Sequence, residues 1–203
     1  MKIAVDAAGG DHGLTPNIEG ALQASNAYGV ALFLVGPAAQ IRSELSARGI
    51  SANDQRFTVV DAPDLVGMDE EPASACKAKP RSSVMVCAEL VADGRAAAFF
   101  STGNSGAAMC AALFHLKRVP GILRPAIAVP IPTPKGVTVL LDSGANADCK
   151  AEHLVQFGLM GSLLSRYLYG VAKPRVGILT IGEEEGKGNA LVKDAIPALK
   201  NAG

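Results

Sequence analysis

Short apolar runs alternate with helix-length amphipathic segments along the chain, and this alternation restricts the possible folds more than any other feature. The pattern predicts strands at residues 2–5, 31–35, 57–60, 97–100, 126–129, 137–141 and 176–181. It predicts helices at residues 17–28, 38–47, 83–92, 105–117, 151–169 and 189–200. Strands that are apolar throughout are typical of a parallel sheet covered by helices on both faces. We therefore expect an α/β fold, a three-layer α/β/α sandwich with a mostly parallel sheet, as a single domain over residues 1–203.

Composition and charge exclude several classes of protein. The formal net charge is zero and no basic run is present, so we expect no nucleic-acid partner. The longest apolar runs, such as 96–100 and 137–141, are too short to span a bilayer. The N-terminus reaches Asp6 too early for a secretory hydrophobic region. These features indicate a cytoplasmic protein.

The four cysteines are widely spaced and form no metal-binding pattern. Free cysteines in such surroundings usually behave as small buried hydrophobes, and we expect reduced thiols. Cys149 is set apart because it lies within one of the polar loops described next.

Four loops rich in Gly, Asn and small polar residues follow predicted strands. They span residues 6–13, 101–106, 142–149 and 182–189. Ligands of parallel sheets bind beyond the carboxyl ends of the strands, so the pattern predicts that the four loops converge on one cleft. Any one loop is equally well explained by turn geometry, which also favours Gly, Asp and Asn.

The loop at 101–106 is the best candidate for an anion site. Its glycines allow backbone N–H groups to approach a ligand, and a helix follows directly, with its positive end toward the loop. Thr102, Asn104 and Ser105 add neutral donors. The patterns GxxxxGK[ST] and GxGxxG are absent from the sequence. Free phosphate or a phosphate ester is therefore favoured over a nucleotide.

Titratable residues in the loops leave several roles open. The carboxylates of Asp6, Asp11, Asp142 and Asp148 are suitable Mg²⁺ ligands, but the same residues satisfy turn geometry, and we predict neither a metal nor another cofactor. His12 and His153 lie in or near these loops and are suited to proton transfer.

Lys187 lies between two glycines after three consecutive acids. One interpretation is a charged surface loop. The other is a functional lysine that holds phosphate, polarises a carbonyl or acts as a nucleophile.

Five segments in order resemble the phosphate acyltransferase (PlsX) family. They are residues 6–12, 101–107, 118–126, 141–149 with 152–154, and 181–184 with 187–189. The resemblance implies transfer of a fatty acyl group from an acyl carrier protein thioester to inorganic phosphate, giving acyl phosphate for phospholipid synthesis. It also implies a homodimer and a fold related to isocitrate and isopropylmalate dehydrogenases and to phosphotransacetylases. A glycerol-3-phosphate acyltransferase would use the product.

This sequence departs from the family pattern at three positions, and these differences concern packing more than chemistry. Ala8, Ser143 and Ala151 stand where the family usually has Met, Val and Pro. Family members also continue past the point that corresponds to Gly203, so we expect this sequence to be the N-terminal part of a longer family member. Peripheral contact with the inner face of the membrane is a further expectation, although no strongly basic amphipathic helix supports it.

The candidate site combines these residues. The candidate catalytic residues are Lys187, His12, His153 and Asn146. The candidate residues for binding phosphate or the acyl group are Asp6, Gly9, Gly10, Asp11, Ser101, Thr102, Gly103, Asn104, Ser105, Gly106, Arg124, Asp142, Gly144, Glu183 and Asn189. Direct attack by phosphate and an acyl-Lys187 intermediate stay open as routes. A phosphotransacetylase-like enzyme that uses acyl-CoA and an inactive truncated fragment stay open as alternative functions.

Overall fold

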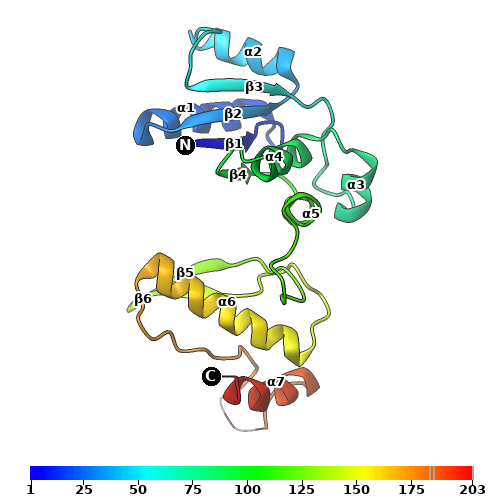
Figure 1. Cartoon of the computed structure of the whole chain (residues 1–203), viewed down its shortest axis with the longest axis vertical. Helices are drawn as coiled ribbons and strands as arrows, with labels where there is room; N and C mark the ends of the chain where they lie inside the picture. Colours follow the sequence, from blue (N-terminus) through cyan, green and yellow to red (C-terminus); the bar gives the residue numbers. More distant parts are fainter. Residues whose placement is uncertain (183, 185, 203) are drawn as a thin grey trace. The chain divides into compact units, whose positions relative to one another are not determined.

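The computed structural model describes residues 1–182, 184 and 186–202 (Figure 1). Contacts divide the chain into two compact units, Met1–Lys117 and Arg118–Gly203, called here the N-terminal and C-terminal units. The expectation of a single domain over residues 1–203 concerns how these units associate and stays a prediction. Each unit is described by itself.

The N-terminal unit is built on a four-stranded parallel sheet. Its elements, in chain order, are β1 (Lys2–Asp6), α1 (Leu14–Tyr28), β2 (Ala31–Gly36), α2 (Ala38–Ala47), β3 (Phe57–Asp61), α3 (Pro72–Ala78), α4 (Ser83–Ala92), β4 (Ala98–Ser101) and α5 (Ser105–Leu116). The strand order is β3-β2-β1-β4, and every neighbouring pair is parallel. This arrangement places the carboxyl ends of β1 and β4 side by side (Figure 1).

Two apolar clusters cover the two faces of this sheet. Side chains of successive residues in a strand point to opposite faces. On one face, Val5 and Leu34 pack with Ile18 of α1 and Ile41 of α2. On the other face, residues such as Phe33 and Val35 pack with Leu90 of α4. The layers are therefore α/β/α, and the predicted fold class is confirmed in this unit.

Helix α3 was not expected, although its start signal is present in the sequence. The Glu71 carboxylate accepts hydrogen bonds from the N–H groups of Ala73 and Ser74, and Pro72 occupies the first turn. The helix has seven residues, too few to show a helical period. It packs with α4 and α5 in a third cluster that includes Cys76, Val84 and Ala111.

The C-terminal unit contains a β-hairpin and two helices among its described residues. Its elements are β5 (Val129–Thr133), β6 (Gly136–Leu140), α6 (Ala151–Tyr169) and α7 (Ala190–Lys200). The hairpin is antiparallel, with Pro130 opposite Val139 and Pro132 opposite Val137. Because backbone N–H groups alternate in direction along a strand, prolines two residues apart leave the donors that face β6 intact.

Two expected strands of the C-terminal unit were wrong. The strand expected at 126–129 is displaced to Val129–Thr133, because the turn between Thr133 and Gly136 sets the register of the hairpin. Residues 176–181 are not a strand, although their composition favours one. Among the described residues no strand pairs with them, and Leu179 and Ile181 are largely exposed. A strand requires a neighbour for its backbone groups, which local composition does not reveal.

Among the described residues, no helix combines the length and the apolar character needed to cross a membrane.

Candidate functional site

The structure brings together two of the four predicted loops. Asp6 at the end of β1 pairs in register with Ser101 at the end of β4. The loops at 6–13 and 101–106 therefore leave the sheet side by side, as expected for the carboxyl ends of adjacent parallel strands.

The Asp6 carboxylate links these two loops. Asp6 is buried, with 3% of its surface exposed. One carboxylate oxygen accepts from the Gly9 N–H at 3.0 Å, and the other accepts from the Ser101 hydroxyl at 2.7 Å. The Ser101 Oγ in turn accepts from the Gly103 N–H at 3.0 Å. Hydrogen bonds to a charged acceptor are stronger than those between two neutral groups. The main role of Asp6 and Ser101 is therefore to hold the two loops in register.

Glycines allow the two loops to pack backbone against backbone. A Cβ atom added to Gly9 would lie 2.5 Å from Asp6 Oδ2 and 3.1 Å from the Gly103 nitrogen. Gly10 has a φ of 86°, and a Cβ there would lie 2.9 Å from Thr102 Oγ1. Both positions therefore require glycine, one because of close contact and one also because of its backbone conformation.

Asn17, at the start of α1, was not predicted as part of the site. Its side-chain nitrogen donates to the carbonyls of Ala7, Gly9 and Gly13, at 2.8–3.1 Å. The Thr102 hydroxyl lies 2.9 Å from Asn17 Oδ1 and 3.1 Å from the Gly9 carbonyl. The sequence placed Asn17 in a helix, and nothing in the local pattern indicates that its side chain folds back over the preceding loop.

Asn104 begins helix α5 and also holds a distant segment. Its Oδ1 accepts from the Ala107 N–H at 3.0 Å, which caps the helix. Its Nδ2 donates to the carbonyls of Gly67, Met68 and Glu70, at 3.1–3.3 Å. The amide is therefore used within the fold. The donors best placed for a ligand are the hydroxyl of the exposed Ser105 and the first N–H groups of α5, at Ser105 and Gly106. The Thr102 hydroxyl, by contrast, donates within the fold.

The remaining candidates in the first loop lie at the surface. Asp11 and His12 are exposed in a turn before α1. Their side chains are accessible beside the loops that Asp6 joins, and a role in catalysis or binding stays a prediction.

In the C-terminal unit, the Asp142 carboxylate organises the loop that follows β6. Oδ1 accepts from the Ile127 N–H at 2.8 Å. Oδ2 accepts from the N–H groups of Ala145 and Asn146, at 3.0 and 2.8 Å, and from Asn146 Nδ2 at 3.1 Å. Asn146 Nδ2 also donates to the Pro125 carbonyl at 2.9 Å. This loop is a tight turn around one carboxylate, and Asn146 is one of its supports.

The structure places the neighbouring candidates Arg124 and Gly144 at the same turn. Arg124 Nη1 donates to the Asp148 carbonyl at 2.9 Å, so the guanidinium closes the end of the turn. Gly144 is exposed and has a φ of 86°. The turn is therefore held by the Asp142 carboxylate, which accepts from its backbone N–H groups, and by the Arg124 guanidinium, which donates to the carbonyl at its end.

His153 is buried at the beginning of α6. Its Nδ1 accepts from the Lys150 N–H at 3.1 Å, and its ring stacks against Phe157 with the ring centres 6.5 Å apart. The structure therefore gives His153 a helix-capping contact. A proton-transfer role for His153 stays a prediction.

The last predicted loop precedes α7. Lys187 is exposed, and its N–H donates to the Glu184 carbonyl at 3.1 Å. The Asn189 side chain caps α7 by accepting from the Val192 N–H at 3.0 Å. Glu183, another candidate, lies outside the described residues.

One part of the site prediction was wrong. We expected all four loops to leave parallel strands, but the loop at 142–149 follows an antiparallel hairpin, and the loop at 182–189 follows no strand. Apolar runs alone do not distinguish parallel from antiparallel pairing, which caused the error. That the four loops form one cleft stays a prediction.

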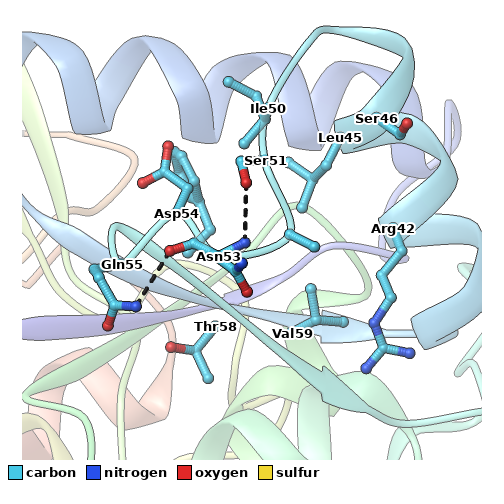
Figure 2. Close-up of a pocket in the computed structure, with 12 residues that line it drawn as sticks. Arg42, Leu45, Ser46, Ile50, Ser51, Asn53, Asp54, Gln55, Thr58 and Val59 are labelled. Atoms are coloured by element: carbon cyan, nitrogen blue, oxygen red, sulfur yellow. Dashed lines mark hydrogen bonds between the residues drawn. The ribbon is translucent and has the colours of Figure 1, made fainter.

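A surface depression of about 490 Å³ lies elsewhere in the N-terminal unit. Arg42 and Ser46 of α2 line it together with Thr58 at the start of β3 (Figure 2). Figure 2 also shows Asn53 on its wall, where the backbone N–H donates to Ser51 Oγ at 3.2 Å. This depression is at the edge where β3 begins, whereas the candidate loops follow the ends of β1 and β4. It is therefore separate from them.

The four cysteines are free thiols. Burial raises the pKa of Cys76 to about 11 and raises the pKa of Cys87 well above its ordinary value. Burial also raises the pKa of Cys149, with a smaller contribution from the Asp142 carboxylate. Since the thiolate is the nucleophile, none of these three is activated, and Cys149 has no sign of a catalytic role.

We predict an order of alkylation that follows from these environments. At neutral pH, iodoacetamide should modify the half-buried Cys110 and Cys149 first, and modify Cys76 and Cys87 only when the N-terminal unit opens. Peptide mapping by mass spectrometry over time measures each rate. Fast modification of Cys87 in the native protein would contradict the packing of α4 against the sheet.

Comparison with known structures supports the fold. The chain superimposes on a phosphotransacetylase from Streptococcus pyogenes with a TM-score of 0.69 and 17% identity, covering 99% of this chain and 64% of that one. It matches the EutD phosphotransacetylase from Staphylococcus aureus with a TM-score of 0.65 and 15% identity, over the same shares of each chain. At these identities the likeness shows the fold, which is that of the phosphotransacetylase-type α/β proteins.

Sequence comparison then shows the family. Residues 1–203 match the family described as "Fatty acid synthesis protein", and the chain belongs to that family. A protein named phosphate acyltransferase from Elusimicrobium minutum is 50% identical over 203 residues, which is 100% of this chain and 59% of the relative. A protein of the same name from Gloeobacter violaceus is 51% identical over 201 residues, 98% of this chain and 58% of the relative. The resemblance to phosphate acyltransferases is therefore confirmed, and the chain spans about three-fifths of the length of these relatives.

Proposed function

We propose that this chain takes part in transferring a fatty acyl group from acyl carrier protein to inorganic phosphate. In the reaction, a phosphate oxygen bonds to the thioester carbonyl carbon and the bond from that carbon to sulfur breaks. Acyl phosphate and the free thiol of the carrier protein result, and the proton lost by phosphate balances the thiolate. The product is an activated acyl donor for phospholipid synthesis.

The observation that carries this proposal is the paired loop at the ends of β1 and β4. The N-terminus of α5 lies at this pair of loops together with the hydroxyl of the exposed Ser105, which suits a small anion. The relatives named phosphate acyltransferase, 50% and 51% identical, support phosphate as that anion.

Positioning is the main contribution that these loops would make. Phosphate is a weak nucleophile in water, and holding it beside the thioester supplies on the order of 7–11 kcal/mol of barrier lowering. Asp6, Ser101 and Gly103 fix the loop, so its donors need no reorganisation when phosphate binds. The backbone N–H groups at Ala145 and Asn146 donate to the Asp142 carboxylate. The loop at 6–13 is therefore the better source of N–H donors for the oxyanion.

Direct attack by phosphate is the route that we favour over an acyl-Lys187 intermediate. Lys187 is exposed on its turn, and an acyl amide is a poor acyl donor. We predict that the intact mass of the chain will show no acyl adduct after incubation with acyl carrier protein thioester without phosphate. An adduct that disappears in Lys187→Ala would instead establish the lysine route.

The alternative of an acyl-CoA-dependent enzyme is favoured by one observation, the fold shared with two phosphotransacetylases. Parallel assays with acyl carrier protein and coenzyme A thioesters, with acyl phosphate trapped by hydroxylamine, separate the two donors. Faster turnover of the carrier-protein thioester is the expected result. Phosphate binding without turnover of either donor would favour the inactive fragment.

The remaining elements of the proposal concern partners and location. The family resemblance implies a homodimer, a functional link to a glycerol-3-phosphate acyltransferase and peripheral contact at the inner face of the membrane. The apolar runs and the N-terminal sequence favour a cytoplasmic location. Sedimentation of the purified chain, alone and with vesicles, tests the dimer and the membrane contact.

A further inference from the structure

Residues 64–71 form a loop that Asn104 ties to the N-terminus of α5. Three of the loop carbonyls, at Gly67, Met68 and Glu70, accept from Asn104 Nδ2 at 3.1–3.3 Å. The same Asn104 side chain caps α5 through its oxygen. The loop therefore lies beside the predicted anion site, and one side chain fixes both.

Further hydrogen bonds make this loop rigid. The Glu70 carboxylate accepts from the Gly67 N–H at 2.7 Å and pairs with Lys79 Nζ at 2.5 Å. Lys79 Nζ also donates to the Leu65 carbonyl at 2.9 Å. Val66, between the exposed positions, is 5% exposed and is anchored in the cluster that also contains Ala107 of α5.

This rigid loop holds two large apolar side chains at the surface. Leu65 is 43% exposed and Met68 is 46% exposed. Single exposed apolar residues are common on proteins and by themselves indicate nothing. Here, however, the Met68 carbonyl lies 3.3 Å from Asn104 Nδ2, the side chain that begins α5, so Met68 is an exposed apolar residue whose backbone lies next to the proposed phosphate site.

The substrate of the proposed function has the matching arrangement. The carbonyl that phosphate attacks is bonded directly to an apolar chain, so an acyl chain must leave the anion site along an adjoining surface. We propose that the loop at 64–71 is this surface, with Met68 contacting the acyl chain and Asn104 acting as the positioning residue that holds the loop. This inference rests on the proposed function.

Charge around the loop favours an acyl chain over an anionic lipid surface. Asp69 is exposed next to Met68, and Glu70 and Glu71 follow. Lys79 and the Gly67 N–H lower the pKa of Glu70, and the contacts of Glu71 with Ser74 lower the pKa of Glu71, so both are ionised at neutral pH. An acidic loop repels anionic headgroups. The flexible thioether of Met68 suits a variable aliphatic chain.

Photolabelling tests the contact directly. The probe is a long-chain fatty acyl thioester of acyl carrier protein with a diazirine near the carbonyl, mixed with the full chain and inorganic phosphate. After irradiation, peptide mapping should find the label on the peptide that contains residues 64–71. Met68→Gln should lower labelling of this peptide about fivefold, because it removes apolar contact at similar size.

Two further variants separate positioning from folding. Asn104→Asp keeps an oxygen to cap α5 but removes the N–H donors to the three carbonyls, so it should lower labelling and speed amide hydrogen exchange in 64–71 while α5 stays protected. Leu116→Gln is the matched control, since Leu116 is 43% exposed at the opposite end of α5. It should leave labelling unchanged.

The outcomes distinguish this inference from the proposed function. Acyl phosphate formation without label on 64–71, or labelling that Met68→Gln and Leu116→Gln change equally, overturns the inference alone. Protection of 64–71 from hydrogen exchange by anionic vesicles, with no acyl labelling there, also overturns it. Absence of both acyl phosphate and label overturns the inference and the proposed function together.

Discussion

Replacing Gly9 with alanine should lower the free energy of unfolding of the N-terminal unit by about 2–4 kcal/mol. The added Cβ would lie 2.5 Å from Asp6 Oδ2 and 3.0 Å from Asp6 Cγ. Atoms at these distances overlap, so the carboxylate or the loop backbone must move.

Neither movement is easy. If the Asp6 carboxylate turns away, it loses its bonds with the Gly9 N–H and the Ser101 hydroxyl, in a site where Asp6 is 3% exposed. A buried charge that loses its donors is strongly destabilising. If the backbone shifts instead, Gly9 moves against Gly103, whose nitrogen is 3.1 Å from the new atom.

Gly20→Ala provides the matched control for this substitution. Gly20 lies within α1, and a Cβ added there meets nothing within 4 Å. The change should stabilise the unit by roughly 0.5–1 kcal/mol, because alanine favours helix more than glycine does. Urea unfolding of both variants, with alkylation of Cys87 as the reporter of the N-terminal unit, measures the effect. Equal stability of Gly9→Ala and Gly20→Ala would show that the two loops do not pack as closely as described.

The sequence predicted the fold of the N-terminal unit well because each strand there is apolar and is followed by a helix. The expected strand at 31–35 and helix at 38–47 correspond to β2 and α2, Ala31–Gly36 and Ala38–Ala47. In the C-terminal unit the same reasoning was less successful. The run at 176–181 has the composition of a strand, but pairing depends on distant residues that composition does not show.

The candidate site was predicted to a similar, partial extent. Polar and Gly-rich strand ends identified Asp6, Gly9 and Ser101, which the structure places in contact. The sequence did not reveal that Asn104 holds Met68, because that contact joins residues 36 positions apart. Such contacts depend on how helices pack, and only the three-dimensional structure shows them.

Removing the Asp142 carboxylate should lower the stability of the C-terminal unit about as much as Gly9→Ala lowers that of the N-terminal unit. Asp142→Ala removes the acceptor of three backbone N–H groups, at Ile127, Ala145 and Asn146, and of the Asn146 side chain. Hydrogen bonds to a charged acceptor contribute about 1.5–3 kcal/mol each, although water replaces some of them in a half-buried turn. We expect a loss of about 2–4 kcal/mol in the stability of the C-terminal unit.

Two other variants show whether Asp142 supports the turn or binds substrate. Asp142→Asn keeps one oxygen but places an amide N–H₂ among N–H donors, so it should also destabilise the unit, by less than alanine does. Asp148→Ala is the control, because Asp148 is exposed and contacts Arg124 through its backbone carbonyl, which alanine retains. Its effect on the free energy of unfolding should lie within about 0.5 kcal/mol.

Amide hydrogen exchange at 142–146 and acyl phosphate formation are measured on the same samples. If turnover falls in proportion to the loss of protection, Asp142 acts by holding the turn. If Asp142→Asn keeps native protection but loses turnover, the carboxylate itself contacts substrate, and its predicted binding role is the correct one.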